Sequence, residues 1–296
     1  MLENITNLEP LEELLDWRIL VYLTVSALIL LLAKLANQLL AGYKLNQQIT
    51  QIDNKAIAVS FAGFTLSVCI IISGVLNSPS SAAIGTPTWS ITDVGSTALW
   101  GIIGAAMLLT SRWFNDKLVL PKFSTKKELL EDQNVGVGAA QAGTYITTAL
   151  IIRSSIAGAD QYGLAMEIAL SLVWFSLSLA LIFLFSKLYQ KVVNFQFHEE
   201  LERDNAAVGV AFAGSLVSFG LLLSFYIHRC DGLLGLLLWA FISAVLLLIV
   251  RCLVDKLLLP SCKLDHEISE DANWGAAIIE VATSIGTALL ITGAFS

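Results

Sequence analysis

Residues 232–254 read GLLGLLLWAFISAVLLLIVRCLV, a run in which Arg251 is the one charged side chain. About 20 consecutive apolar residues are enough for a helix to cross the hydrocarbon core of a bilayer. Seven further runs of this kind lie along the chain. The sequence therefore predicts an all-α polytopic membrane protein with eight transmembrane helices, at residues 18–41, 55–76, 91–113, 134–156, 164–188, 205–227, 232–254 and 273–294.

The composition excludes several broad classes of protein. Of the 296 residues, 56% are apolar and 14% are charged, whereas soluble domains average about 45–50% apolar and about 25% charged residues. The net charge of −7 argues against nucleic acid as a partner. The four cysteines lack zinc or disulfide spacing, and the sequence carries no metallopeptidase, serine-hydrolase or P-loop motif. We therefore expect no cofactor, no metal and no enzymatic activity.

The basic residues fall on one side of the predicted spans. Cytoplasmic loops of membrane proteins retain Lys and Arg, and fourteen of the seventeen basic residues lie in or beside the four loops that join an odd-numbered span to the next even one. They are Lys34, Lys44, Lys55, Arg112, Lys117, Lys122, Lys126, Lys127, Lys187, Lys191, Arg203, Arg251, Lys256 and Lys263. The opposite side keeps Arg18, Arg153 and Arg229. We therefore expect these loops in the cytoplasm and both termini outside. The N-terminal tail is acidic and lacks the basic region of a signal peptide, so we expect the first span to be retained.

A short signature precedes each even-numbered span. Its four copies read DNKAIAVSFAG (53–63), DQNVGVGAAQAG (132–143), DNAAVGVAFAG (204–214) and DANWGAAIIEVA (271–282). Counted from the Asn, positions 2, 4 and 9 are always Ala or Gly. Because membrane helices associate through small residues, we expect these faces to pack closely.

A second level of repetition relates the two halves of the chain. The order Trp, Arg, Pro, Asn recurs with 21 residues from Trp to Pro, 9 from Arg to Pro and 13 from Pro to Asn. The two sets are Trp100, Arg112, Pro121, Asn134 and Trp239, Arg251, Pro260, Asn273. This spacing predicts two tandem four-helix repeats, residues 1–158 (hairpins 18–76 and 91–156) and 159–296 (hairpins 164–227 and 232–294). Each hairpin holds two spans, so we expect parallel repeats about an axis along the membrane normal.

The acidic-Asn signature has two interpretations. Asp and Asn are preferred N-caps of helices, and a carboxylate complements the positive end of the helix dipole. Alternatively, four carboxylates ring a cytoplasmic mouth and concentrate cations. The residues concerned are Asp53, Asn54, Asp132, Asn134, Asp204, Asn205, Asp271 and Asn273. Two further pairs, Arg112 with Asp116 and Arg251 with Asp255, are four residues apart and read as interfacial side-chain pairs.

The residue at position 7 after the Asn distinguishes two kinds of hairpin, because it is aromatic in the first and third copies and polar in the second and fourth. The four residues are Phe61, Gln141, Phe212 and Glu280. Helical spacing extends two polar stripes from them, Gln141, Tyr145, Thr148 and Glu280, Ser284, Thr287. Intramembrane carboxylates are functional candidates by default. If the stripes meet, a neutral Glu280 donates to Gln141 or Tyr145, and we expect this in preference to a salt bridge with Arg251 or Lys256. Such a bond either serves function or only joins the halves.

The repeated signature, its Glu-Asp-x-Asn variant at 131–134 and 270–273, and the Asp-Lys-Leu-x-Leu-Pro run at 116–121 and 255–260 resemble the bacterial YjfL-like inner-membrane family, domain of unknown function 350. The resemblance covers about residues 34–294. It implies a multi-pass protein of the bacterial inner membrane, with the outer side periplasmic. It also implies an association with cytoplasmic membrane-stress proteins, and it names no reaction.

Two functions follow as hypotheses. The first is a channel or transporter that passes or senses a small cation or proton, with Glu280 and Gln141 lining the polar path. The alternative is a membrane scaffold that recruits cytoplasmic stress partners through residues 123–133 and 198–203. The lipid bilayer is the surrounding partner in both, and oligomerisation is left open.

Overall fold

The computed structural model describes residues 17–77, 91–156, 163–229, 232–260 and 263–295, with side chains from residue 19 onward. The acidic N-terminal tail, the side chain of Arg18, residues 78–90 of the loop after the second span, the expected boundary at 158/159, Cys230 and Cys262 lie outside this part. All regular structure in the described residues is helical, and eight helices are long and apolar enough to cross a membrane. The predicted all-α membrane architecture is confirmed.

The eight long helices match the predicted spans to within a few residues, and the largest difference is at the end of α8, which continues to Val192. They are α2 (Trp17–Ala41), α4 (Lys55–Leu76), α5 (Ile91–Phe114), α7 (Val135–Ile156), α8 (Leu164–Val192), α10 (Ala206–Arg229), α11 (Leu233–Leu253) and α13 (Trp274–Ala294). Their apolar side chains remain widely exposed on the outside of the bundle. This surface suits a lipid environment, in which outward-facing apolar residues cost nothing.

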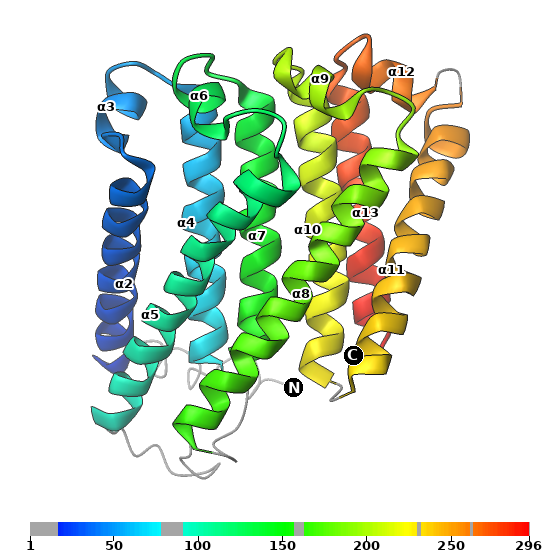
Figure 1. Cartoon of the computed structure of the whole chain (residues 1–296). Helices are drawn as coiled ribbons and strands as arrows, with labels where there is room; N and C mark the ends of the chain where they lie inside the picture. The colour runs from blue at the N-terminus through cyan, green and yellow to red at the C-terminus, as the bar shows by residue number, and fades with distance from the viewer. Residues whose placement is uncertain (1–16, 78–90, 157–162, 230–231, 261–262, 296) are drawn as a thin grey trace, which may run out of the picture.

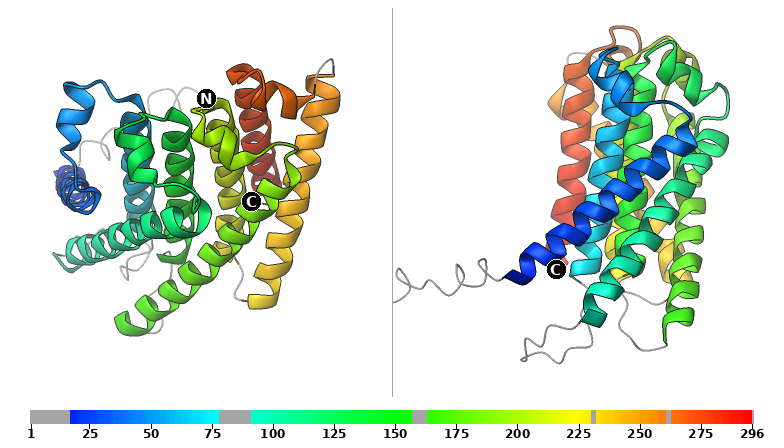
Figure 2. Two further views of the ribbon diagram at one scale, coloured as in Figure 1. Left: turned by 45° about the horizontal axis from the view of Figure 1, so that its top comes forward. Right: turned by 90° about the vertical axis from the view of Figure 1, so that its left-hand side faces the viewer.

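The helices form two layers. The second, fourth, sixth and eighth spans, called the even helices because of this order along the chain, are α4, α7, α10 and α13. They stand side by side in one row, with α7 packed between α4 and α10 and with α10 packed between α7 and α13 (Figure 1). The third, fifth and seventh spans cover this row from one side: α5 contacts α4 and α7, α8 contacts α7 and α10, and α11 contacts α10 and α13. Figure 2 shows the layer from two further directions. Among the described residues, α7 is the most deeply buried span.

The row differs from the arrangement expected from sequence. Two hypotheses from the sequence required a different arrangement: in one the polar stripes on α7 and α13 meet, and in the other four carboxylates ring a common mouth. The structure places α10 between α7 and α13, and it places α4 and α13 at opposite ends of the row. The physical reason is that each even helix has small residues on two opposite faces, so it packs against a predecessor and a successor.

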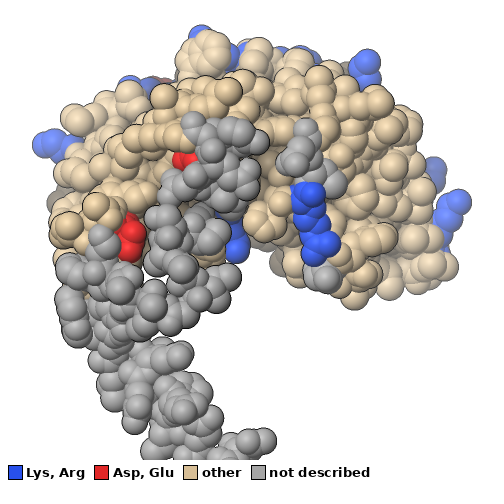
Figure 3. Space-filling model, turned by 90° about the horizontal axis from the view of Figure 1, so that it is seen from below, with Lys and Arg blue, Asp and Glu red and all other residues tan. Residues whose placement is uncertain are grey.

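Four short helices follow the odd spans and lie together at one end of the bundle (Figure 1). They are α3 (Leu45–Thr50), α6 (Thr125–Leu130), α9 (Phe197–Glu202) and α12 (Leu264–Ser269). Each leads into its even span through a residue with φ between 46° and 62°, namely Asp53, Gln133, Asp204 and Ala272. Where the described residues are visible at the opposite end, most of the surface is formed by residues other than Lys, Arg, Asp and Glu (Figure 3).

Two π-helical turns extend the odd spans of the second and fourth hairpins, η1 (Asn115–Val119) and η2 (Val254–Leu258). The wider winding of a π-helix changes the alignment of residues four apart, so the predicted pairing of each Arg with the Asp four residues later is wrong for Arg251. Its guanidinium binds other carboxylates, and Asp255 accepts a hydrogen bond from the backbone N–H of Leu264 at 2.7 Å. Arg112 donates to Asn37 on α2 at 3.0 Å.

Candidate functional site

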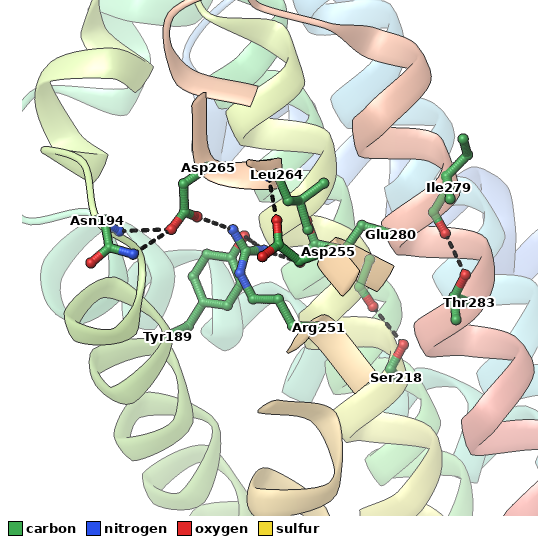
Figure 4. Close-up of polar contacts among 11 residues, drawn as sticks. Tyr189, Asn194, Ser218, Arg251, Asp255, Leu264, Asp265, Ile279, Glu280 and Thr283 are labelled. Atoms are coloured by element: carbon green, nitrogen blue, oxygen red, sulfur yellow. Dashed lines mark hydrogen bonds and ion pairs between the residues drawn. The ribbon is translucent and has the colours of Figure 1, made fainter. Parts of the chain in front are cut away.

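Arg251 is the centre of a buried charge cluster near the end of the bundle that carries the short helices (Figure 4). Its guanidinium forms an ion pair with the carboxylate of Glu280 on α13 and a second one with Asp265 on α12, at 2.5 Å. Glu280 is 1% exposed and Arg251 is 8% exposed. One cation is therefore held between two carboxylates, of which the inner one is fully enclosed.

Two polar side chains complete the cluster. The guanidinium of Arg251 lies 3.4 Å from the hydroxyl of Tyr189 on α8 and 5.4 Å from the centre of its ring. On the outer side, Asn194 donates to Asp265 from its side-chain amide, at 2.6 Å, and from its backbone N–H, at 3.3 Å. The cluster thus joins α8, α11, α12 and α13, and it leads from the membrane interior to an exposed loop.

The local sequence explains how these groups meet. Glu280 lies seven residues into the hairpin signature, about 10 Å along the helix axis from Asn273. Arg251 lies shortly before the π-turn η2, and its side chain reaches Glu280 on α13. The second carboxylate oxygen of Glu280, Oε2, is buried and accepts no hydrogen bond from the described residues. The carboxylate is therefore held on one oxygen only.

The prediction of a hydrogen bond from Glu280 to Gln141 or Tyr145 is wrong. Gln141 is bonded to the hydroxyl of Ser60 on α4, and Tyr145 packs edge-on against Phe64, with ring centres 5.5 Å apart. Both belong to the α4–α7 interface, one helix away from α13. The salt bridge with Arg251, which we expected less, is the contact that the structure contains.

The first half of the chain holds a less charged counterpart. Arg112 occupies the position of Arg251, 139 residues earlier, and Gln141 occupies the position of Glu280. Lys126 stands where the second half has Asp265. Both carboxylates of the cluster are therefore replaced in the first half, so the complete cluster occurs once.

Further hydroxyl groups lie on α13, the helix of Glu280, and on α10, its neighbour in the row. Ser284 on α13 and Ser215 and Ser218 on α10 are buried, and Thr287 donates to the carbonyl of Thr283 in its own helix. The remaining member of the first stripe, Thr148 on α7, is buried, and its hydroxyl has no hydrogen-bond partner among the described residues.

At the end of the bundle opposite the charge cluster lies a polar pocket of about 490 Å³. Its polar lining residues are Asn77, Arg153, Ser154, Ser224, His228 and Thr292. Ser224 on α10 and Thr292 on α13 belong to the same two helices as the buried hydroxyls. Polar groups therefore recur along α10 and α13 from this pocket toward Glu280.

The Asn of each signature caps its own helix. Its side-chain oxygen accepts from a backbone N–H two or three residues later, as Asn134 does from Val137 at 2.9 Å. The carboxylates have separate roles along the row: Asp132 pairs with Lys127 at 3.4 Å, and Asp204 accepts from the backbone N–H of Val135 in the preceding hairpin at 3.0 Å. The signature therefore serves capping and contact between hairpins, and its acidic residues are spread along the row.

Sequence reasoning missed three members of the charge cluster and gave Arg251 the wrong role. Tyr189, Asn194 and Asp265 lie in segments that carry no repeated motif. The sequence signal that could have found the cluster is the 139-residue offset between the halves. At this offset Gln141 corresponds to Glu280 and Lys126 to Asp265, so both positions are acidic only in the second half.

The family model described as Domain of Unknown Function (DUF350) matches residues 7–156 and 163–295, which together cover most of the chain. The chain belongs to this family. Two curated relatives are similar to it. A UPF0719 transmembrane protein of Aquifex aeolicus (strain VF5) is 23% identical over 253 residues, covering 83% of this chain and 88% of that protein. The UPF0719 transmembrane protein YshE of Bacillus subtilis (strain 168) is 25% identical over 118 residues, covering 40% of this chain and 87% of that protein. No solved structure matches.

Proposed function

We propose that this DUF350 protein moves or senses protons or small cations across the bacterial inner membrane, with Glu280 as the exchange point. The observation that carries the proposal is the buried carboxylate of Glu280, held by Arg251 on one oxygen and unpaired on the other among the described residues. Ionisable groups inside membranes are costly and mark ion or proton pathways.

Arg251 acts in this proposal as an internal substitute for the transported ion. While no ion is bound, its guanidinium neutralises Glu280. A proton or a cation that reaches Glu280 replaces that charge, and Arg251 remains paired with Asp265 at the outer edge of the cluster. The polar groups along α10 and α13 supply hydrogen-bonding partners between Glu280 and the pocket at the other end. The earlier hypothesis of a path shared by Glu280 and Gln141 is replaced by a path along the α10–α13 interface.

A flux assay in proteoliposomes tests the proposal. Purified protein is reconstituted with a pH-sensitive or cation-sensitive dye inside, and a membrane potential is imposed. We expect flux with the wild-type protein and its loss in Glu280→Gln, which keeps the size of the side chain but cannot ionise. Glu270→Gln, at an exposed position outside the cluster, is the matched control and keeps the flux. Equal flux in Glu280→Gln and wild type, or no flux above protein-free vesicles, overturns the proposal.

The second candidate function is recruitment of cytoplasmic stress partners. The supporting observation is that residues 123–133 and 198–203 carry exposed charged side chains, among them Lys126, Glu131 and Arg203. An absence of flux combined with a partner captured by the wild-type protein, and lost when these charges are reversed, favours this function over transport.

The location is part of the same proposal. The four short helices would lie in the cytoplasm, because the basic residues gather there, and both termini would lie in the periplasm. The division into tandem repeats 1–158 and 159–296 remains a prediction that superposition of the two halves would test.

A further inference from the structure

The three interfaces within the row of even helices use the same positions of the signature. Position 9 of one helix packs on position 8 of the next: Gly63 lies on Ala142, Gly143 on Ala213, and Gly214 on Val281. A Cβ atom added to any of these glycines would overlap the neighbour. Each contact is therefore possible only because the position is small.

Positions 2 and 4 form a second contact of the same kind. Gly138 of α7 lies against the backbone of Ala56 in α4, and Gly209 of α10 lies against the backbone of Gly136 in α7. In both cases position 4 of the later helix meets position 2 of the earlier one. Each even helix thus has two different faces, one for its predecessor and one for its successor.

Hydrogen bonds between neighbouring hairpins follow the same direction. The side-chain amide of Asn54 donates to the carbonyl of Leu129 at 2.8 Å, that of Asn134 to Leu201 at 2.6 Å, and that of Asn205 to Ile268 at 3.0 Å. All three acceptors lie near the end of the short helix of the next hairpin, and all three Asn residues are buried. The contact is heterologous and runs head to tail.

The two ends of the row leave the two halves of this contact open. The successor face of α13 carries Gly275, Ala282 and Gly286, of which the first two are exposed, and an added Cβ at Gly286 would meet nothing within 4 Å. The side-chain amide of Asn273 donates within its own hairpin, to Glu267, and Asn273 is exposed, unlike its three counterparts. The successor face of α13 therefore carries the small residues of the signature, but no helix among the described residues packs on it.

The opposite end carries the complementary face. Positions 4 and 8 of α4 are Ala58, which is half-buried, and Ala62, which is exposed. The outer layer is open at the same place: α5, α8 and α11 each contact the even helix of the preceding hairpin, and no hairpin precedes α2 among the described residues. Of the candidate spans, α2 is the least buried.

We propose that α13 of one copy packs against α4 of a second copy and repeats the contact that joins the hairpins inside each chain. In this arrangement Ala282 lies on Ala62, and the amide of Asn273 donates to the carbonyl of Ile49, the counterpart of Leu129. Asp53 then accepts from the backbone N–H of Trp274, as Asp204 does from Val135 within the chain. Heterologous contacts of this kind build rings or open rows of copies.

Disulfide cross-linking between differently tagged copies tests the proposal. The four native cysteines are replaced by Ser, and Ala62→Cys and Ala282→Cys are introduced in separate copies that are co-expressed in membranes. We expect an oxidised dimer that contains one copy of each kind, and loss of that dimer when either variant is expressed alone. Self-cross-linking of Ala282→Cys alone would show a symmetric contact, and no cross-link in the mixture would leave lipid as the neighbour. Either result overturns the proposal.

Two blocking variants make the test independent of cysteine chemistry. Ala282→Phe and Ala62→Phe place a ring on opposite halves of the contact, and each is expected to shift the detergent-solubilised protein to the mass of a monomer. Leu234→Phe, at a position of α11 that is 71% exposed, is the matched control and leaves the mass unchanged. Thermal unfolding of each variant separates a lost contact from a lost fold. A folded Ala282→Phe variant that keeps the wild-type mass also contradicts the proposal.

Discussion

The guanidinium of Arg251 and the carboxylate of Glu280 form an ion pair inside the helix bundle, between residues that are 8% and 1% exposed. The two side chains come from adjacent spans of the last hairpin, α11 and α13. Their first-half counterparts, Arg112 and Gln141, contact Asn37 and Ser60 instead. The ion pair is therefore specific to one end of the row, and it couples the membrane interior to Asp265.

Removal of one partner of this pair destabilises the fold more than removal of both. Arg251→Met leaves the carboxylate of Glu280 buried without a counter-charge, which costs about 3–5 kcal/mol of unfolding free energy. The double variant Arg251→Met, Glu280→Gln removes the unpaired charge and recovers much of this loss. The measurement is chemical or thermal unfolding in detergent. Arg203→Met is the control, since the exposed pair of Arg203 with Glu200 is worth at most about 1 kcal/mol. A single variant as stable as this control would show that the carboxylate is solvated.

Asn134 and Asn273 should respond differently to the same substitution. Asn134→Ala removes a helix cap, worth about 0.5–2 kcal/mol, and also the buried hydrogen bond between hairpins to the carbonyl of Leu201, worth about 0.5–1.5 kcal/mol. Asn273→Ala removes an exposed cap and one bond to Glu267. Unfolding measurements should therefore show the larger loss for Asn134→Ala. Equal losses would mean that the contact between hairpins contributes nothing.

An added methyl group should lower the stability of the protein in the packed row but not in the outer layer. Gly209→Ala places a Cβ against the backbone of Gly136 and should cost about 1–3 kcal/mol, the range for overpacked interiors. Gly95→Ala on α5, where an added Cβ meets nothing within 4 Å, should leave the stability unchanged or raise it. Melting temperatures of the two purified variants give the comparison. An unaffected Gly209→Ala variant would contradict the close approach of α7 and α10.

His198 gives the fold a predictable response to acid. Burial between Phe123 and Phe197, followed by the charges of Lys122 and Lys187, lowers the pKa of His198 to about 4. The unfolded chain, with a His pKa of about 6.5, then binds a proton that the folded protein does not. Stability from this group is complete above about pH 6.5 and falls as the pH drops toward 4. We expect His198→Gln to flatten the melting temperature across this window. An unchanged pH profile in the variant would refute the assignment.

The orientation in the membrane can be tested with single cysteines. Lys126→Cys, at an exposed position of α6, should react with a membrane-impermeant reagent only when the cytoplasmic side is accessible. Cys230, which lies outside the described residues, should react from the periplasm. The split of basic residues between the two sides is the reason for this expectation. Labelling of Lys126→Cys in intact cells would show that the protein has the opposite orientation.

The sequence alone predicts the spans because hydrophobic runs of this length have one common structural meaning. It also predicts the small faces, since the Gly and Ala positions of the signature recur at fixed spacing. The row could not be predicted, because helical periodicity shows that a face is small but not which helix it meets. The partner of Glu280 was missed for a related reason: Arg251 reads as an interfacial anchor by its position in sequence, and only the packing of α11 against α13 brings it inward.

The exchange at Glu280 is most directly tested by infrared difference spectroscopy of the reconstituted protein during a pH or cation step. We predict a carboxyl band that changes in the wild-type protein under the conditions that support flux and is absent in Glu280→Gln, with Glu270→Gln keeping the wild-type spectrum. Identical difference spectra for the wild type and Glu280→Gln would show that the carboxylate stays paired with Arg251 throughout. That result would contradict an exchange role for Glu280.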